Sequence, residues 1–341
     1  MAGTMKAWEM SGATGLDNIH LVEKPIPTPG PGQVVLRMRA ATLNYRDLLI
    51  VQGGYGSRQK LPLVPLSDGA GEVAATGPGV TRLKTGDRAI PSFFQGWIAG
   101  PPSEKKFGTS LGGALDGVLS EYQSFREEGL VATPAHLSDV EAAAYPCAGL
   151  TAWSAVIDQG KIKPGDSVLV QGTGGVALFA LQFAKMAGAE VIVTSSSDDK
   201  LARARALGAD HLINYKATPE WGKAARKIMG GEGVDHVVEL GGAETLSESI
   251  RAVRTGGTIS MIGVLSGARK ELALPLVVMA NLRLQGVTVG SRETLADMLR
   301  SVAHFRSKPA VDRVFPMAEF KDAVAYMKKG QHFGKVGISF P

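Results

Sequence analysis

A glycine-rich turn between an apolar run and a helical pattern carries the most specific chemistry in this sequence. Gly172, Gly174 and Ala177 give the spacing Gly-x-Gly-x-x-Ala directly after the apolar residues 168–170. Such a turn lets the backbone approach a pyrophosphate, which the N–H groups and partial positive charge of a helix N-terminus then bind. An ordinary turn with spare glycines is the alternative. The strand–turn–helix context favours a dinucleotide site. The residues expected to form it are Gly172, Thr173, Gly174, Gly175 and Val176.

The next predicted strand lacks the acidic residue that would select NAD. An NAD site usually places Asp or Glu about 20 residues past the first glycine, where it binds the ribose hydroxyls. Here the run Glu190–Thr194 leads into Ser195, Ser196 and Ser197, and basic residues follow from Lys200. Hydroxyl groups and a cation suit a 2′-phosphate, so we expect NADPH. Ser197 can also cap the next helix while Lys200 faces solvent, and both readings can hold at once.

Strands and helices alternate around this turn, which is typical of a doubly wound parallel sheet and an α/β fold. The predicted strands are Val168–Gln171, Val191–Thr194, His211–Asn214, His236–Leu240, Thr258–Gly263 and Leu284–Val289. The predicted helices between them are Val176–Ala187, Lys200–Leu207, Trp221–Met229 and Thr245–Ala252.

The first 125 or so residues have a different character, since they are rich in Gly and Pro and contain short alternating strands. They predict a β-rich domain. Two helical segments, Leu295–Phe305 and Met317–Met327, follow the alternating region, and the closing strand Gly334–Phe340 is expected to return to the first domain.

Composition narrows the class of protein. The net charge is +5, and the 37 basic and 32 acidic residues are interspersed, without the clustered basic stripe that nucleic-acid binding usually needs. Cys147 is the only cysteine, residues 1–11 lack a signal-peptide core, and no apolar run is long enough for a membrane helix. We therefore expect a cytoplasmic enzyme with a small-molecule substrate and neither a nucleic-acid nor a membrane partner.

Together these patterns resemble the medium-chain dehydrogenase/reductase superfamily over nearly the whole chain. The motifs that carry the resemblance are Gly71–Val73, Gly86–Arg88, Asp116–Val118 with Glu121–Tyr122, Cys147–Ala152, the glycine-rich turn, Leu207–Asp210 and Gly256–Gly257. The resemblance is strongest to the zinc-free quinone oxidoreductase-like branch. Leu43–Leu48, Ser291–Arg292 and His332–Lys335 resemble a group often labelled zinc-type alcohol dehydrogenase-like. The resemblance to the superfamily implies two domains. Residues 1–128 and 306–341 are expected to form a GroES-like catalytic domain, and residues 129–305 a Rossmann domain.

The resemblance also shows which residues stand at the positions of the catalytic zinc ligands. The catalytic zinc ligands of the zinc-containing relatives are a Cys, a His and a second Cys, and these positions fall on Asn44, Ser67 and Cys147. A catalytic zinc normally needs three protein ligands of Cys, His or carboxylate type. This chain offers Cys147 and at most Asp68, so we expect no metal and interpret Cys147 as a small buried hydrophobic residue.

Without a metal, hydrogen bonds must polarise the substrate. A conjugated carbonyl or quinone accepts hydride as a delocalised oxyanion, which a few fixed donors can stabilise. By resemblance, the amide of Asn44 faces the substrate oxygen, Tyr55 matches the proton donor of enoyl thioester reductases, and Tyr45 is the competing donor. Asp47 is expected to pair with Arg46 and to orient the loop. Each tyrosine can instead anchor its loop by packing.

The resemblance assigns the cofactor contacts as well. Thr151 and the glycine-rich turn take the ribose and pyrophosphate, Ser196, Lys200 and Tyr215 match 2′-phosphate contacts, and Lys335 caps the cofactor. The residues implied to border the nicotinamide are Gly241, Gly263, Val264, Leu265, Ser291 and Arg292.

Three functions remain open at this point. The first is an NADPH-dependent reductase of quinones, enones or enoyl compounds, and the second is a metal-free alcohol dehydrogenase or carbonyl reductase. The third is an NADPH-binding protein without rapid turnover. We also expect a homodimer, because Leu284–Val289 is a candidate edge strand and relatives pair this strand across a dimer axis.

Overall fold

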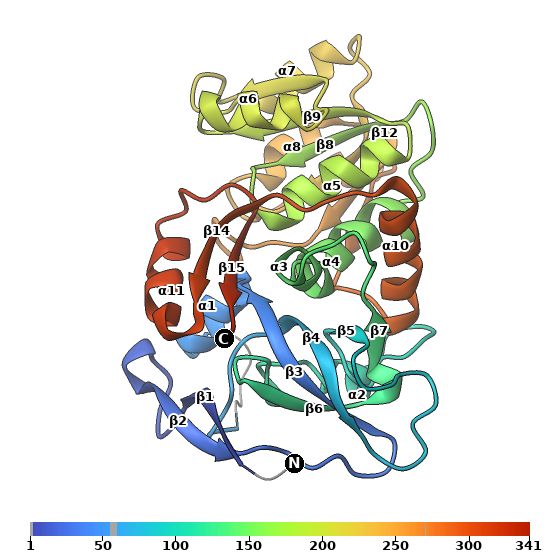
Figure 1. Ribbon diagram of the computed structural model, residues 1–341. Coiled ribbons are helices and arrows are strands. Elements are labelled where there is room, and N and C mark those ends of the chain that lie inside the picture. The colour runs from blue at the N-terminus through green and yellow to red at the C-terminus, as the bar shows by residue number, and fades with distance from the viewer. Residues whose placement is uncertain (1–2, 55–59, 270) are drawn as a thin grey trace. The chain divides into compact units, whose positions relative to one another are not determined.

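The computed structural model describes residues 3–54, 60–269 and 271–341, which form two compact units (Figure 1). The first unit holds the described residues up to Leu150 and from Gly290 onward, and the second holds Thr151–Val289. The boundaries expected from the sequence were 128/129 and 305/306. No helix in these three stretches is long and apolar enough to cross a membrane.

The first unit is β-rich. A seven-stranded sheet has the order β14-β15-β3-β4-β5-β7, with β6 also paired to β3, and β1 and β2 form a separate antiparallel pair. The strands are β1 (Thr4–Met10), β2 (Ile19–Pro25), β3 (Gln33–Thr42), β4 (Asp68–Thr76), β5 (Arg88–Pro91), β6 (Tyr122–Arg126), β7 (Leu130–Ala132), β14 (Val311–Pro316) and β15 (Lys335–Ser339). The helices are α1 (Tyr45–Val51), α2 (Glu104–Phe107), α3 (Asp139–Ala143), α10 (Arg292–Phe305) and α11 (Phe320–Lys328).

The C-terminal strand returns to the first unit, as the sequence predicted. Gly337–Ser339 of β15 pairs antiparallel with Ala40–Thr42 of β3. Residues 129–150 and 290–305 also belong to this unit, because α3 packs on β3 and β4 and α10 contacts β7. These helices cover the sheet of the first unit, which is why the observed boundaries differ from the expected ones.

The second unit is a parallel sheet of six strands in the order β10-β9-β8-β11-β12-β13. Numbered within the unit, this is 3-2-1-4-5-6, the order of the Rossmann fold. Its strands are β8 (Ser167–Gln171), β9 (Glu190–Ser195), β10 (His211–Asn214), β11 (Val234–Glu239), β12 (Val253–Met261) and β13 (Arg283–Gly286). Its helices are α5 (Gly175–Met186), α6 (Asp198–Ala206), α7 (Trp221–Ile228), α8 (Leu246–Ala252) and α9 (Leu274–Met279), and α4 (Leu150–Trp153) starts at the boundary.

The strands of the parallel sheet carry apolar residues in succession, so apolar side chains lie on both faces of the sheet. Leu169, Val237 and Ile259 pack in one cluster with Trp221 of α7 and Ile250 of α8. The residues that alternate with them along the strands face the opposite side, because successive side chains of a strand point to opposite faces. Helix α5 packs on β8 and β9. The prediction of a doubly wound sheet is therefore confirmed.

Two predicted strands differ from the structure, and one helix was not predicted. The last strand is shorter than predicted, because β13 ends at Gly286 and Val289 has a left-handed φ of 51° that a strand does not allow. Strand β12 begins at Val253, five residues before its predicted start. Helix α9 was not predicted, because none of its apolar residues is buried and its sequence therefore shows no amphipathic period.

Candidate functional site

The glycine-rich turn has open space where a phosphate group would approach. Gly172 follows β8 with φ of 78°, in the left-handed region, and Gly174 is the N-cap of α5. A Cβ built on either glycine would meet no atom within 4 Å, and no side chain caps the helix. The turn therefore presents bare backbone and the start of a twelve-residue helix, which fits a dinucleotide pyrophosphate.

The end of β9 gathers the residues predicted to bind a 2′-phosphate. Tyr215, just past β10, donates its backbone N–H to the Ser195 carbonyl at 3.1 Å, and its side chain is 41% exposed. Ser197 caps α6 by accepting the Lys200 backbone N–H at 3.4 Å, so the capping alternative for Ser197 is confirmed. Ser196 lies between these residues in the chain. The fold thus places hydroxyls and Lys200 at one carboxyl edge of the sheet.

Gln171 and Glu239 connect β8 and β11, between which the strand order reverses. Gln171 Nε2 donates to Glu239 Oε2 at 2.7 Å, and Gln171 Oε1 accepts the N–H groups of Leu240 and Gly241 at 3.0 Å each. Ligands of doubly wound sheets bind at this switch point. The sequence analysis missed both side chains, although a carboxylate that ends an otherwise apolar strand was a readable signal.

Glu239 itself is fully buried and accepts five hydrogen bonds. Its Oε1 takes the backbone N–H groups of Gly241 and Gly242 at 2.9 Å each and the Thr245 hydroxyl at 2.5 Å. Its Oε2 takes Gln171 Nε2 and the Ser249 hydroxyl. The carboxylate therefore fixes the loop that contains Gly241, which was predicted to border the nicotinamide.

The remaining predicted cofactor residues of the second unit lie in different surroundings. Gly263 packs tightly, because a Cβ there would lie 2.0 Å from the Leu240 carbonyl oxygen. Val264 and Leu265 are more than half exposed, whereas Thr151 is buried.

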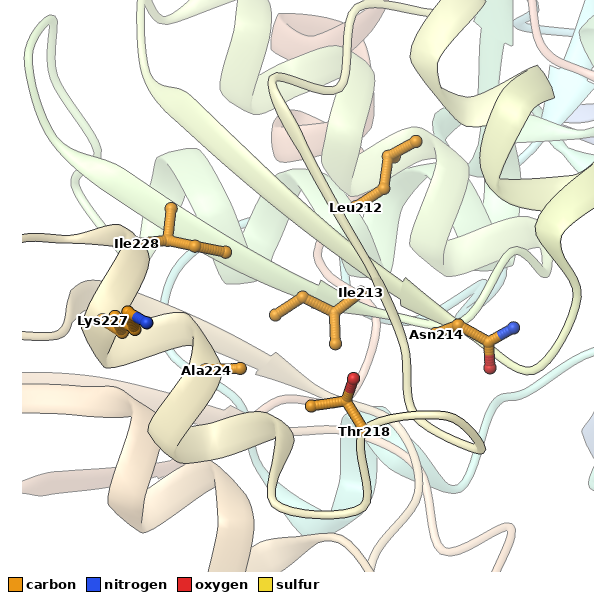
Figure 2. Close-up of a pocket in the computed structure, with 7 residues that line it drawn as sticks. All are labelled: Leu212, Ile213, Asn214, Thr218, Ala224, Lys227 and Ile228. Atoms are coloured by element: carbon orange, nitrogen blue, oxygen red, sulfur yellow. The ribbon is translucent and has the colours of Figure 1, made fainter.

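A hollow of about 450 Å³ lies beside β10 and α7 (Figure 2). Its lining is mainly apolar, with Asn214, Thr218 and Lys227 as the polar members. None of the predicted site residues lines it, so we do not assign the cofactor to this hollow.

A buried polar cluster forms the candidate catalytic site of the first unit. Asn44, the N-cap of α1, is 8% exposed, and Lys335, the first residue of β15, is 3% exposed. Lys335 Nζ donates to Asn44 Oδ1 at 2.5 Å and to the Leu43 carbonyl at 2.8 Å. Lys335 was predicted to cap the cofactor, and the contacts seen here join it to Asn44 instead.

The three positions that correspond to zinc ligands in relatives meet around Asp68. Ser67 donates its hydroxyl to Asp68 Oδ1 at 2.7 Å, and the Cys147 backbone N–H donates to Asp68 Oδ2 at 3.1 Å. Asn44 Nδ2 lies 3.5 Å from Ser67 Oγ. Leu66, just before this pair, has φ of 68°, a strained value of the kind that clusters at functional sites.

The chemistry of these side chains does not suit a metal ion. An amide at Asn44 and a hydroxyl at Ser67 are not among the Cys, His and carboxylate ligands that zinc takes in proteins. Burial raises the pKa of the Cys147 thiol, and the nearby Asp68 carboxylate raises it further. Cys147 is half-buried, less than expected. No three His, Cys, Asp or Glu side chains in the described parts of the chain come together as a metal site.

Asp47 and Arg46 form the expected ion pair next to this cluster. Arg46 Nη1 lies 3.5 Å from Asp47 Oδ1, and Asp47 Oδ2 accepts the Asn44 backbone N–H at 2.7 Å. Desolvation raises the pKa of Asp47 to about 6, against the lowering effect of Arg46. Arg46 also donates to the Leu111 carbonyl at 3.0 Å and lies over the Phe93 ring. The pair thus holds the start of α1 and the Asn44 backbone in place.

Three other predicted residues that the structure describes in the first unit, Tyr45, Ser291 and Arg292, form no side-chain hydrogen bond or ion pair with this cluster. Tyr45 begins α1 and is 48% exposed. Ser291 caps α10, and Arg292 donates its backbone N–H to the Trp97 carbonyl at 2.8 Å. Tyr55 lies outside the described residues, so its role stays a prediction.

Comparison with known proteins agrees with both units. A family model described as "Alcohol dehydrogenase GroES-like domain" matches residues 30–135, and one described as "Zinc-binding dehydrogenase" matches residues 175–304. A zinc-type alcohol dehydrogenase-like protein from Schizosaccharomyces pombe is 41% identical over 330 residues, covering 95% of each chain. The chain belongs to the medium-chain dehydrogenase/reductase superfamily, in its zinc-type alcohol dehydrogenase-like branch. It is therefore an oxidoreductase of a family whose members bind nicotinamide cofactors.

Solved structures of this family have the same fold. A putative alcohol dehydrogenase from Sinorhizobium meliloti 1021 is 42% identical, with a TM-score of 0.94 and complete coverage of both chains. An NAD-dependent alcohol dehydrogenase is 35% identical, with a TM-score of 0.90, covering 98% of this chain and 99% of its own. A crotonyl-CoA reductase from Streptomyces collinus is 29% identical over 368 residues, covering 94% of this chain and 81% of its own length.

Proposed function

We propose that this protein is an NADPH-dependent, zinc-independent reductase that transfers hydride to a quinone, an enone or another activated double bond or carbonyl. The observation that carries the proposal is the cluster around Asn44. Where a zinc enzyme has three metal ligands, this chain has the Asn44 amide, the Ser67 hydroxyl and the half-buried Cys147. Lys335 holds the Asn44 amide oxygen, and Asp68 accepts the Ser67 hydroxyl and the Cys147 backbone N–H. The Ser67 hydroxyl donates to Asp68, so the Asn44 amide N–H is the donor that we propose for the substrate.

Hydrogen-bond donors suit one type of acceptor better than another. When bound, a reduced nicotinamide supplies the hydride. In a conjugated acceptor, hydride addition at carbon moves an electron pair onto the oxygen, which becomes a delocalised enolate or phenolate. A fixed amide N–H of Asn44 stabilises that charge. A simple ketone yields a localised alkoxide, for which a metal ion is the stronger stabiliser.

The proton that completes the reaction needs a separate donor. After hydride addition, the enolate carbon or oxygen takes a proton from a hydroxyl group or from water. Tyr45 is half exposed and at the start of α1, which leaves its hydroxyl accessible, and Tyr55 remains the competing candidate. The crotonyl-CoA reductase relative supports this class of reaction.

NADPH is the proposed cofactor because of the end of β9. Ser195 ends β9 without a carboxylate of its own, Ser196 and Lys200 follow it in the chain, and the Tyr215 backbone N–H donates to the Ser195 carbonyl. The nearest acidic side chain, Asp198, accepts a hydrogen bond from Asn214 Nδ2 at 2.8 Å. A 2′-phosphate is attracted by hydroxyls and an ammonium group and repelled by a carboxylate. The NAD-dependent relative at 35% identity makes cofactor choice a direct test of this assignment.

A metal-free alcohol dehydrogenase or carbonyl reductase is the second candidate. A relative named as alcohol dehydrogenase, from Geobacillus stearothermophilus, is 32% identical over 326 residues and favours it. The discriminating experiment measures NADPH oxidation with quinones, enones, enoyl thioesters and simple ketones at matched concentrations. Turnover of the conjugated acceptors supports the reductase, and turnover confined to ketones supports the alternative. Tight NADPH binding without turnover of any acceptor would indicate a binding protein.

We also propose that the chain forms a homodimer through the edge of the second unit. Strand β13 is the last strand of its sheet, and α9 just before it exposes four apolar side chains. The exposed fractions are 65% for Leu274, 54% for Leu276, 69% for Val278 and 81% for Met279. An unpaired edge with a neighbouring apolar patch is typical of an interface. In the proposed dimer, β13 of one copy pairs with β13 of the other.

A further inference from the structure

Lys335 is a buried lysine that makes two hydrogen bonds and one ion pair with oxygens of the first unit. Its Nζ donates to the Leu43 carbonyl at 2.8 Å and to Asn44 Oδ1 at 2.5 Å, and lies 3.7 Å from Asp68 Oδ2. An ammonium group has three N–H donors and no acceptor. Two of these donors make hydrogen bonds, the Asp68 contact is an ion pair, and the residue is only 3% exposed.

The contact with Lys335 decides how the Asn44 amide is turned. Because an ammonium group can only donate, the amide atom that faces it must be the oxygen. The NH₂ end then points the other way, where Nδ2 lies 3.5 Å from Ser67 Oγ. Ser67 gives its own proton to Asp68 Oδ1 at 2.7 Å, so its oxygen stays an acceptor. One Nδ2 proton is directed at Ser67, and the second is left for a ligand.

We infer that Lys335 is a positioning residue that fixes Asn44 as a hydrogen-bond donor to the substrate. This inference rests on the proposed function. A lysine that held the amide oxygen would also polarise the amide, because a charge-assisted hydrogen bond strengthens the next one in a chain. The site then selects a substrate oxygen that accepts a hydrogen bond, such as a conjugated carbonyl or its enolate, over a hydroxyl that must donate one.

Lys335 has a second effect that the test must separate. Asp68 is completely buried, and a buried carboxylate that loses its neighbouring cation is strongly destabilising. Lys335→Met alone can therefore fail to fold. The double substitution Lys335→Met/Asp68→Asn removes both charges together and keeps the hydrogen bonds that Asp68 accepts from Ser67 and Cys147 partly available.

The test is a double-mutant cycle on turnover. Lys335→Met and Asn44→Ala are each expected to lower kcat for an enone by about 100-fold or more, the scale of losing an oxyanion donor. Lys335→Met in the Asn44→Ala background is expected to cause no further loss, and the Kd for NADPH is expected to stay unchanged. If Lys335→Met alone does not fold, the charge-neutral pair replaces it in both backgrounds. Additive losses, or a raised Kd with unchanged kcat, would overturn the inference.

A matched lysine in the other unit serves as the control. Lys185 Nζ also contacts a carbonyl and a carboxylate, Ala189 O at 3.0 Å and Asp210 Oδ2 at 2.7 Å. Lys185→Met is expected to leave kcat for the enone unchanged.

The wild type, the two single variants Lys335→Met and Asn44→Ala, and the variant that combines them also separate this inference from the proposed function. If the wild-type protein turned over no conjugated acceptor, the proposed function would fail, while their free energies of unfolding would still test the contact. Non-additive losses of stability support the link between Lys335 and Asn44, and additive losses overturn it.

Discussion

Gln171 Nε2 donates a hydrogen bond to Glu239 Oε2 across the point where the strand order of the parallel sheet reverses. The two residues end adjacent strands, β8 and β11, at the edge where doubly wound folds bind their ligands. Glu239 also accepts the backbone N–H groups of Gly241 and Gly242. The pair therefore shapes the loop at Gly241 and Gly242, which we propose to bind the cofactor, through buried hydrogen bonds.

Glu239→Gln should weaken cofactor binding. All five groups around the carboxylate donate hydrogen bonds, and a glutamine would turn its own NH₂ donor toward some of them. We expect the Kd for NADPH, measured by fluorescence titration, to rise by about 10-fold, the scale of one buried unsatisfied group. Glu248→Gln is the control, because Glu248 accepts the Gly222 N–H between α7 and α8. If Glu239→Gln left the Kd for NADPH unchanged, the loop at Gly241 and Gly242 would not be part of the cofactor site.

Lys200→Ala should distinguish the two nicotinamide cofactors. If Lys200 binds a 2′-phosphate, its loss removes a charge-assisted contact that only NADPH can make. We expect the Kd for NADPH to rise by roughly 10-fold or more and the Kd for NADH to stay the same. Arg205→Ala, on an exposed position of the same helix, is the matched control and should affect neither. Equal weakening of both cofactors by Lys200→Ala would argue against the phosphate assignment.

Asp47 should make the protein more stable toward mildly acidic pH. Its pKa is raised from 3.8 to about 6 by desolvation, so the folded state binds the proton more tightly than the unfolded state. This contribution is fully present below pH 3.8 and is lost as the pH rises through about 6. Between pH 4 and 7, the free energy of unfolding of the wild type relative to Asp47→Asn should fall by about 2 kcal/mol. Urea denaturation at several pH values measures it, and a constant difference would contradict the prediction.

The exposed face of α9 predicts self-association. Light scattering should give twice the chain mass of 35.7 kDa. Val278→Lys/Met279→Lys should yield monomers, because two charges would be buried against the partner copy. Leu21→Lys changes an apolar residue that is 43% exposed in the other unit and should leave the dimer intact. A monomeric wild type would reject the interface.

Local patterns explain why much of the fold could be predicted from the sequence. The glycine spacing after Val170 and the apolar runs of the parallel strands are signals within a few residues, and they indicated the sheet and its cofactor loop. Helix α9 could not be recognised this way, because an exposed apolar segment has no buried face and therefore no period. The shortened β13 follows from the left-handed backbone at Val289, which its sequence does not show.

The candidate catalytic site was harder to predict, because its contacts join distant parts of the chain. Lys335 and Asn44 are separated by 291 positions, and no periodic pattern relates them. The sequence could indicate that Asn44 had replaced a metal ligand, but only the fold shows which group holds its amide. Asp68 was considered as a ligand candidate, and the structure instead places it as the acceptor that joins Ser67, Cys147 and Lys335.

We propose that hydrogen-bond donors take the place of a metal ion in this protein. The most direct measurement is the rate of NADPH oxidation with an enone by protein dialysed against a chelator, with residual metal quantified by mass spectrometry. We predict that the dialysed protein keeps its full rate of NADPH oxidation at far less than one metal ion per chain, and that adding zinc back does not raise this rate. Loss of turnover on dialysis and its recovery with zinc would contradict it.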